Sequence, residues 1–187
     1  IGYVRTLNEH AQTRYFICFA VAISATIGVA FSGNIFTTYL FYELITFSTY
    51  ALVAHKETPE ARQGAKVYFV FLFGTSVAFL LSATFLTYYA TGTLDFSNQG
   101  IFNDAREKGL SDIFLIVTFG LFIAGTSKAA MMPFHAWLPR AMVAPTPVSA
   151  FLHAVAVVKS GIFIVVKIVL HLFGINLLNE LRLGTAL

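Results

Sequence analysis

Residues 112–173 read DIFLIVTFGLFIAGTSKAAMMPFHAWLPRAMVAPTPVSAFLHAVAVVKSGIFIVVKIVLHLF and contain two long apolar runs, 112–137 and 145–173. Each run is long enough to cross the hydrocarbon core of a bilayer, which takes about 20 apolar residues in an α-helix. The prolines that open the second run suit the first turn of a helix, where no backbone donor is needed. Pro133 falls inside the first run and predicts an interruption there.

The residues before this stretch contain three more apolar runs, at about 15–31, 35–54 and 61–91. A polar connection follows the third run. The sequence therefore predicts an all-α integral membrane protein with about five transmembrane helices, in a single transmembrane domain over residues 1–187. The competing interpretation is a soluble helical bundle. Consecutive runs of near-bilayer length disfavour it.

The composition supports a lipid environment. Hydrophobic residues make up 57% of the chain and charged residues 11%, with a mean hydropathy of +0.76, whereas soluble domains carry about 25% charged residues. The net charge of +3, without a basic run, gives no indication of nucleic-acid binding. Cys18 is the single cysteine, so the sequence predicts neither a disulfide framework nor a cysteine-based metal site.

The ends and connections suggest context and orientation. The chain opens on Ile1 in a polar stretch without a signal peptide, which we interpret as an internal piece of a longer protein. Arg5, Arg14, Lys56, Arg62 and Arg140 fall on one side of the predicted spans, and Arg106, Lys108 and Arg182 fall on the other. The first side is therefore expected to be cytoplasmic, in the cell membrane of a prokaryote.

Four ionisable residues interrupt the apolar runs: Glu43, Lys128, His153 and Lys159. Such a side chain at the bilayer centre costs about 2.5–3.5 kcal/mol on insertion scales, so it needs a partner or a water-filled path. A static ion pair between Glu43 and Lys128 would explain these two alone. The presence of His153 and Lys159 in a neighbouring span favours a proton relay instead.

Four further residues have both a structural and a functional interpretation. Lys66 near the start of its span could reach the interface or take part in the relay, and His135 beside Pro133 could cap broken backbone or carry a proton. Lys167 and His171 lie near the far end of the fifth run, where we expect their side chains to extend to the membrane surface.

The proposed relay has a chemical basis. Burial disfavours the charged form of lysine and of glutamate, and a neighbouring opposite charge favours it, so movement of the carboxylate would release a lysine proton. Histidine titrates near neutrality and suits an intermediate carrier. Backbone freed at Pro133 would line a hydrated cavity close to Lys128. His153 and Lys159 point to different faces of a helix, so water or other helices must join them.

The run 125–142, GTSKAAMMPFHAWLPRAM, continues through 145–150, PTPVSA, to 152–154, LHA. This pattern resembles the signature of the antiporter-like subunits shared by Mrp-type sodium/proton antiporters, membrane-bound hydrogenases and respiratory complex I. The segments 41–44, FYEL, and 64–69, GAKVYF, also match that family. Members have about fourteen helices built on two inverted repeats, and this chain resembles the first repeat of that larger bundle.

The resemblance implies roles for individual residues. Glu43 resembles the glutamate that pairs with the central lysine and influences its protonation, and Lys128 resembles that lysine. His153 matches the histidine of the connecting relay, and Lys66 matches a lysine on the helix between. Lys159 in its context is most similar to Mrp-type D subunits and their hydrogenase relatives.

The resemblance also implies proton translocation by one subunit of a multisubunit Mrp-type antiporter, with other membrane subunits, protons and sodium as partners. It leaves open whether sodium crosses this subunit or a neighbour. The alternative is a pumping subunit of a redox-driven complex. Arg140 stands where many complex I members carry an acid, which makes complex I itself the weaker match without excluding it. The resemblance brings no cofactor to this subunit, so enzyme chemistry would reside elsewhere in such a complex. A membrane scaffold with fixed ion pairs is the third interpretation.

Overall fold

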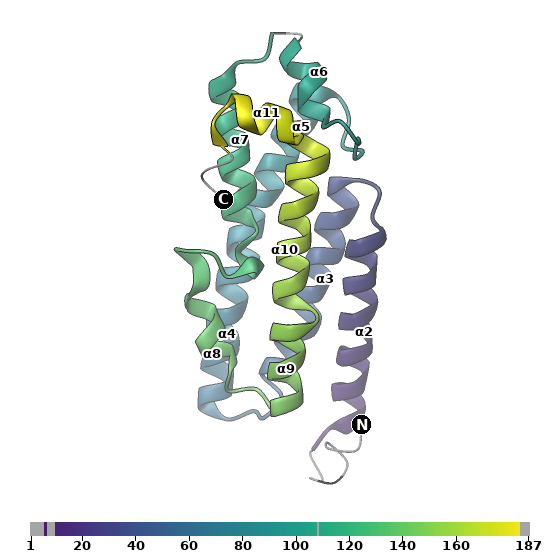
Figure 1. Ribbon diagram of the computed structural model, residues 1–187. Coiled ribbons are helices and arrows are strands. Elements are labelled where there is room, and N and C mark those ends of the chain that lie inside the picture. The colour runs from purple at the N-terminus through teal and green to yellow at the C-terminus, as the bar shows by residue number, and fades with distance from the viewer. Residues whose placement is uncertain (1–5, 7–9, 108, 184–187) are drawn as a thin grey trace.

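The computed structural model describes residue 6, residues 10–107 and residues 109–183, and these form a bundle of helices that run up and down along one axis (Figure 1). No strand occurs among the described residues, where Asn34 and Asp95 form one isolated bridge. The all-α fold predicted from the sequence is confirmed.

The first half of the chain makes three passes along the bundle. Its helices are α2 (Gln12–Phe31), α3 (Ile35–Val53) and α4 (Pro59–Thr75), which continues through the π-helical turn η1 (Ser76–Leu81) into α5 (Ser82–Thr91). The short α6 (Ile101–Glu107) lies across one end (Figure 1).

The second half makes one broken pass and one return. Its elements are α7 (Asp112–Gly125), η2 (Ser127–Ala129), η3 (Phe134–Ala136), α8 (Trp137–Ala141), α9 (Thr146–Ala154), α10 (Val157–Lys167), the π-helical η4 (Ile168–Phe173) and α11 (Ile175–Glu180). The broken segment between α7 and α8 bulges from the side of the bundle (Figure 1).

Three described helical segments are long and apolar enough to cross a membrane: Gln12–Phe31, Pro59–Thr91 and Thr146–Phe173. The apolar helix α7 is shorter, and α3 carries many tyrosine and threonine residues. Bilayer crossing by α3 and by the broken pass, and hence the count of five spans, therefore stays a prediction.

Local signals set several helix ends. The Asn34 side chain accepts a hydrogen bond from the Thr37 amide at 2.7 Å and caps α3. Thr58 does the same for the Ala61 amide at 3.2 Å, with Pro59 in the first turn of α4. Gly92, with φ +72°, ends α5 in the left-handed region that favours glycine.

The interruption of the fourth pass is confirmed, but it begins earlier than the sequence indicated. Regular helix ends at Gly125, so Lys128 lies inside the break rather than five positions before it, and Pro133 lies near the other end of the break. The proline marks where helix cannot continue. Tertiary hydrogen bonds, described below, determine where helix stops.

A second break, which the sequence did not reveal, separates α9 from α10. There the amides of Val155 and Ala156 both donate to the Phe151 carbonyl, at 3.1 and 2.9 Å. A bond from residue i to i−5 is a local π-type widening of the helix. No glycine or proline marks it, so the apolar run reads as continuous.

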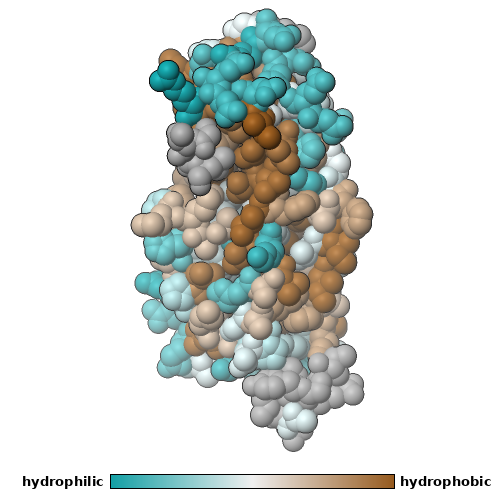
Figure 2. Space-filling model, viewed as in Figure 1, coloured by the Kyte–Doolittle hydropathy of each residue, from teal (hydrophilic) through white to brown (hydrophobic). Residues whose placement is uncertain are grey.

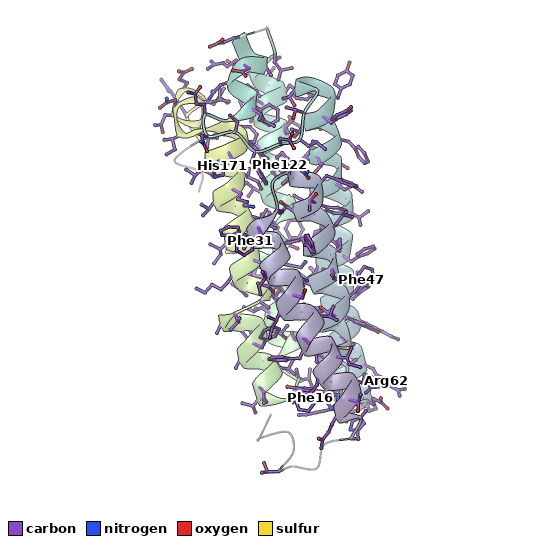
Figure 3. All side chains as sticks on the ribbon, turned by 90° about the vertical axis from the view of Figure 1, so that its right-hand side faces the viewer. Phe16, Phe31, Phe47, Arg62, Phe122 and His171 are labelled. Atoms are coloured by element: carbon purple, nitrogen blue, oxygen red, sulfur yellow. The ribbon has the colours of Figure 1, made fainter. Side chains whose placement is uncertain are left out.

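On the face shown in Figure 2, hydrophilic residues cover the upper end, and hydrophobic residues form much of the middle, with some hydrophilic ones among them. Arg14 pairs with Glu57 at 2.8 Å at one end, where Arg62 also lies (Figure 3). Arg106 pairs with Asp112 at 3.0 Å and with Glu180 at the other end. This grouping follows the predicted one, although Arg5 and Lys108 lie outside the described residues.

Candidate functional site

Lys128 sits in the break of the fourth pass and is completely buried. Its ammonium donates a hydrogen bond to the backbone carbonyl of Tyr42 on α3 and lies 3.2 Å from the centroid of the Tyr42 ring. Its backbone amide donates to the Tyr42 hydroxyl at 3.2 Å. A single tyrosine therefore holds Lys128 by three different groups.

Other side chains satisfy the backbone that the break exposes. The Trp137 indole donates to the Ser127 carbonyl at 3.1 Å, and the Ser127 and Thr75 hydroxyls lie 2.6 Å apart. The Tyr42 hydroxyl also reaches the Gly125 carbonyl at 3.5 Å. Buried backbone groups of this kind need such partners. Tyr42, Thr75 and Trp137 were not predicted as site residues, because nothing in an apolar run indicates which hydroxyl or indole will meet a helix break.

Glu43 follows Tyr42 on α3 and is 7% exposed. Both of its carboxylate oxygens are buried without a direct hydrogen-bond partner in the described part of the chain. Lys128 is the cation that acts on this carboxylate, with the Ser76 and Thr46 side chains also nearby. An unpaired buried carboxylate is costly unless it gains a polar partner or takes up a proton.

Glu43 and Lys128 do not form a direct ion pair. Among the described residues, no nitrogen–oxygen distance of 4.0 Å or less joins them, and the ammonium instead bonds to the Tyr42 carbonyl. Their interaction is electrostatic and acts across a gap. The fixed ion pair considered from the sequence is thus not what the structure contains.

Helix α10 closes the break from the other side. A Cβ atom at Gly161 would meet the Ala129 nitrogen and would lie 2.7 Å from the Lys128 carbonyl carbon. Gly125 packs in the same way against Leu80 of the π-helical turn η1. Glycine is required at both places because backbone approaches backbone.

The other predicted relay residues lie away from this pair. His153 is half-buried at the end of α9, with its Nε2 3.2 Å from the Met142 sulfur, and Lys159 is exposed on α10. Within the described ranges neither forms a hydrogen bond or ion pair with Glu43 or Lys128. The relay therefore does not close through direct contacts among the described residues.

Lys66 and His135 are both exposed. Lys66 lines a pocket of about 370 Å³ together with Arg14, Glu57 and Arg62, at the end that we expect to be cytoplasmic. His135 lies in the single turn η3, beyond Pro133. Over the described residues, no group of three or more His, Cys, Asp or Glu side chains could hold a metal ion.

Lys167 differs from the expectation that it extends to the surface. Its residue is 9% exposed, and its ammonium points inward to α2, where it bonds to the carbonyls of Val29, Ala30 and Ser32. The last carbonyls of a helix lack partners and attract a cation. The sequence could not indicate that the end of α2 would lie beside α10.

The family can now be assigned. A family described as NADH:quinone oxidoreductase/Mrp antiporter, TM, matches residues 32–182. The chain belongs to this family. The resemblance found in the sequence is therefore confirmed, and with it the chain's place among integral membrane proteins.

Two curated relatives are Na(+)/H(+) antiporter A1 subunits. That of Staphylococcus epidermidis is 36% identical over 172 residues, covering 90% of this chain and 20% of the relative. That of Staphylococcus saprophyticus is 36% identical over 164 residues, covering 86% and 20%. These are A subunits rather than the D subunit suggested by the sequence around Lys159. The chain spans about a fifth of the length of these relatives.

Two solved structures contain chains with a similar fold. A chain of the Mrp complex from Dietzia sp. DQ12-45-1b is similar with a TM-score of 0.74 and 30% identity, over 90% of this chain and 18% of that one. A chain of respiratory complex I from Thermus thermophilus gives a TM-score of 0.67 at 24% identity, over 82% and 33%, a similarity of fold alone.

Proposed function

We propose that this chain is the proton-carrying core of one subunit of a multisubunit Mrp-type cation/proton antiporter in a prokaryotic cell membrane. The observation that supports this most is a fully buried lysine, Lys128, placed in a helix break beside an unpaired buried carboxylate, Glu43. An ionisable residue at membrane depth is by default a candidate for ion or proton transfer. The antiporter relatives support the choice of transported ions.

Glu43 acts as an electrostatic switch and Lys128 as the group that holds the proton. A charged carboxylate nearby favours the ammonium form of Lys128, and loss of that charge favours proton release. Because the two groups act across a gap rather than through a direct bond, a change at Glu43 alters the charge near Lys128 without breaking its contacts with Tyr42.

The onward path uses His153 and Lys159, and Lys66 belongs to the entry side. Lys159 is exposed in this chain although it lies in an apolar run. A charge facing lipid at that depth is costly. The position of Lys159 supports the idea that other protein, from another subunit or another part of the polypeptide, covers this side chain and completes the relay. His135, exposed beside the break, fits the same interpretation.

Substitution of Lys128 tests the proposal in the assembled complex. Lys128→Met keeps an unbranched side chain of similar length but cannot carry a proton, and Lys128→Ala removes it. We expect transport into membrane vesicles to fall by about 100-fold or more, the scale of an acid–base group, with assembly retained. Lys56→Met, at an exposed loop position, is the control. An assembled Lys128→Met complex with normal transport would overturn the proposal.

The second candidate is a pumping subunit of a redox-driven complex, supported by the family description and by the fold shared with complex I. Optical and paramagnetic-resonance spectra of the native complex, purified through this subunit, separate the two. Stoichiometric flavin or iron–sulfur signals favour the redox complex, and a clean spectrum favours the antiporter. A double variant that exchanges Glu43 and Lys128 tests the scaffold interpretation. Transport should survive the exchange if the two residues only hold the helices together, and should be lost if they form a relay.

A further inference from the structure

Lys167 is a second buried lysine, and the relay proposed above does not use it. Its ammonium lies 2.7 Å from the Ser32 carbonyl and 3.2 Å from the Ser32 hydroxyl, with the Val29 and Ala30 carbonyls at 3.3 Å. All of these acceptors are neutral. Among the described residues, no carboxylate lies within 4.0 Å of this ammonium, and no titratable side chain forms a hydrogen bond with it.

A pair of hydroxyls leads from Lys167 toward the centre of the bundle. The Ser32 and Thr38 oxygens are 2.5 Å apart, and either can donate. Thr38 is fully buried on α3, one helical turn before Tyr42, which holds Lys128. Ser32 and Thr38 therefore start a line of polar groups that leads from Lys167 toward α3, and in this arrangement their hydroxyls also donate to the Val29 and Asn34 carbonyls, both at 2.8 Å.

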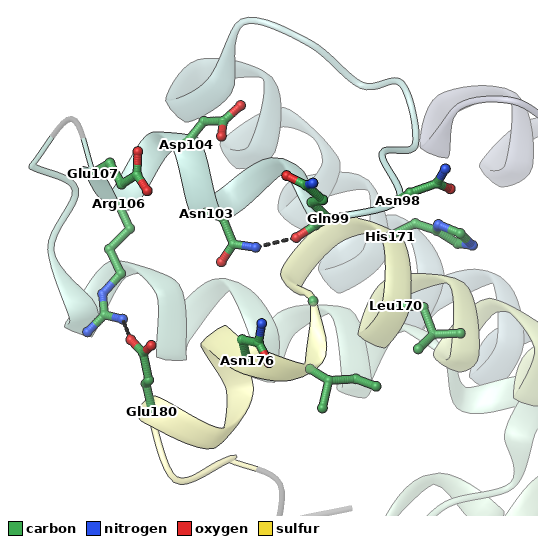
Figure 4. A pocket seen from close by; sticks show the side chains of 12 residues that line it. Asn98, Gln99, Asn103, Asp104, Arg106, Glu107, Leu170, His171, Asn176 and Glu180 are labelled. Atoms are coloured by element: carbon green, nitrogen blue, oxygen red, sulfur yellow. Dashed lines mark hydrogen bonds and ion pairs between the residues drawn. The ribbon is translucent and has the colours of Figure 1, made fainter.

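A polar pocket lies on the other side of Lys167. His171, one turn further along the same helical segment, lines a pocket of about 950 Å³ with Asn98, Gln99, Asp104 and Glu180 (Figure 4). This pocket is at the end opposite Arg14 and Arg62, near α6 and α11. The Phe96 ring separates the two basic groups, 4.7 Å from the lysine ammonium and 6.0 Å from the imidazole.

We propose that Lys167, with Ser32 and Thr38, is a second proton-holding site that connects the Lys128 centre to the pocket at the far end. The ammonium gives one proton to water on the His171 side. It regains one through the hydroxyls, each of which accepts one proton and donates another, so neither keeps a charge. The proposal requires water at two places, between Thr38 and the Lys128 centre and past the Phe96 ring between Lys167 and His171. This inference rests on the proposed function.

The experiment must separate proton holding from simple capping of α2. Lys167→Gln keeps donors for the helix carbonyls but cannot hold a proton, and Lys167→Arg keeps charge and donors but does not release its proton. If Lys167 holds protons, both variants assemble and their transport rates fall by about 100-fold or more, the lower end of the range for acid–base groups. Lys56→Gln serves as the exposed control.

Normal transport in an assembled Lys167→Gln or Lys167→Arg complex would overturn the inference and leave Lys167 as a cap. If neither variant assembles, Thr38→Val decides, because it removes one hydroxyl of the route at nearly constant volume: slow transport supports the route and normal transport overturns it. Lys128→Met measured in parallel distinguishes the two proposals. Inactive Lys128→Met with active Lys167 variants refutes only the second site, whereas active Lys128→Met refutes the proposed function itself.

Discussion

At the scale of single residues, Tyr42 does more for the centre than its place in an apolar run suggests. Its carbonyl accepts a hydrogen bond from the Lys128 ammonium, and the centroid of its ring lies 3.2 Å from that ammonium. Its hydroxyl accepts a hydrogen bond from the Lys128 backbone amide. A cation above an aromatic face is stabilised by the ring, and more so when water is excluded. The lysine is thus held without a carboxylate in contact, which leaves Glu43 free to act from a distance.

We expect Tyr42→Phe to destabilise the helix break while keeping the contacts that hold the Lys128 ammonium. The ring and the carbonyl remain, while the Lys128 amide and the Gly125 carbonyl lose a buried partner. Such a loss costs about 1–3 kcal/mol. Thermal unfolding in detergent should therefore occur at lower temperature, and transport should slow but persist. Tyr50→Phe, on the more accessible side of α3, is the matched control; equal unfolding temperatures for the two variants would contradict this account of the break.

At the scale of elements, the break is enclosed by four neighbours: α3, α4, the π-helical turn η1 and α10. The Thr75 hydroxyl reaches Ser127 from the α4 side, and Gly161 brings the α10 backbone against Lys128. A helix end buried in a membrane protein is tolerated where neighbouring elements satisfy its backbone. The position of α10 is therefore as important for the lysine site as α7 itself.

Gly161→Ala tests this close approach. The new Cβ atom would lie 2.7 Å from the Lys128 carbonyl carbon, so α10 or the break must move. Overpacking of this kind costs about 1–3 kcal/mol, and we expect lower thermal stability and slower transport. Gly74→Ala is the control, because a Cβ there meets nothing within 4 Å and alanine favours helix by about 1 kcal/mol. A stabilised Gly161→Ala protein would mean that the helices are not in close contact here.

The elements also show what the sequence could and could not indicate. Apolar runs ended by prolines, glycines and capping residues located both ends of the first three passes to within a few residues, because those signals are local, but they did not indicate the end of α7 at Gly125 or the short helices α6 and α11. The start of the break at Thr126 depends on Tyr42, which comes from a distant segment, and on Trp137, which follows the break in the same pass. The inward orientation of Lys167 depends on the end of α2. Long-range contacts of this kind leave no periodic pattern in the chain.

At the scale of the whole molecule, much of the middle of the bundle is hydrophobic (Figure 2), and charged pairs lie at both ends, as a bilayer with aqueous phases on either side would favour. Ion pairs fasten both ends, with Arg106 joined to Asp112 and Glu180 at one and Arg14 joined to Glu57 at the other. Hydrogen bonding to Glu180 raises the pKa of Arg106, so this cation stays charged at any working pH. In the pairs with Arg14 and Arg106, the carboxylates are thus the partners that acidification neutralises.

Glu57 provides a pH-dependent test of this fastening. Its hydrogen bond and charge interaction with Arg14, at 2.8 Å, hold the pKa of the carboxyl below its ordinary value of 4.5. A lowered pKa in the folded state adds stability that is fully present above the unfolded pKa and disappears as pH falls through the folded one. Wild type should therefore unfold at a slightly higher temperature than Glu57→Gln near pH 7, and the two should converge as the medium is acidified below pH 4.5. Because both side chains are nearly half exposed, the difference should be small and should shrink in high salt.

Arg14→Gln should have little further effect in the Glu57→Gln protein, since the same ion pair is already broken. A difference that persists unchanged into acid would show that Glu57 acts through the positive-φ turn it occupies, at φ +56°, rather than through its charge.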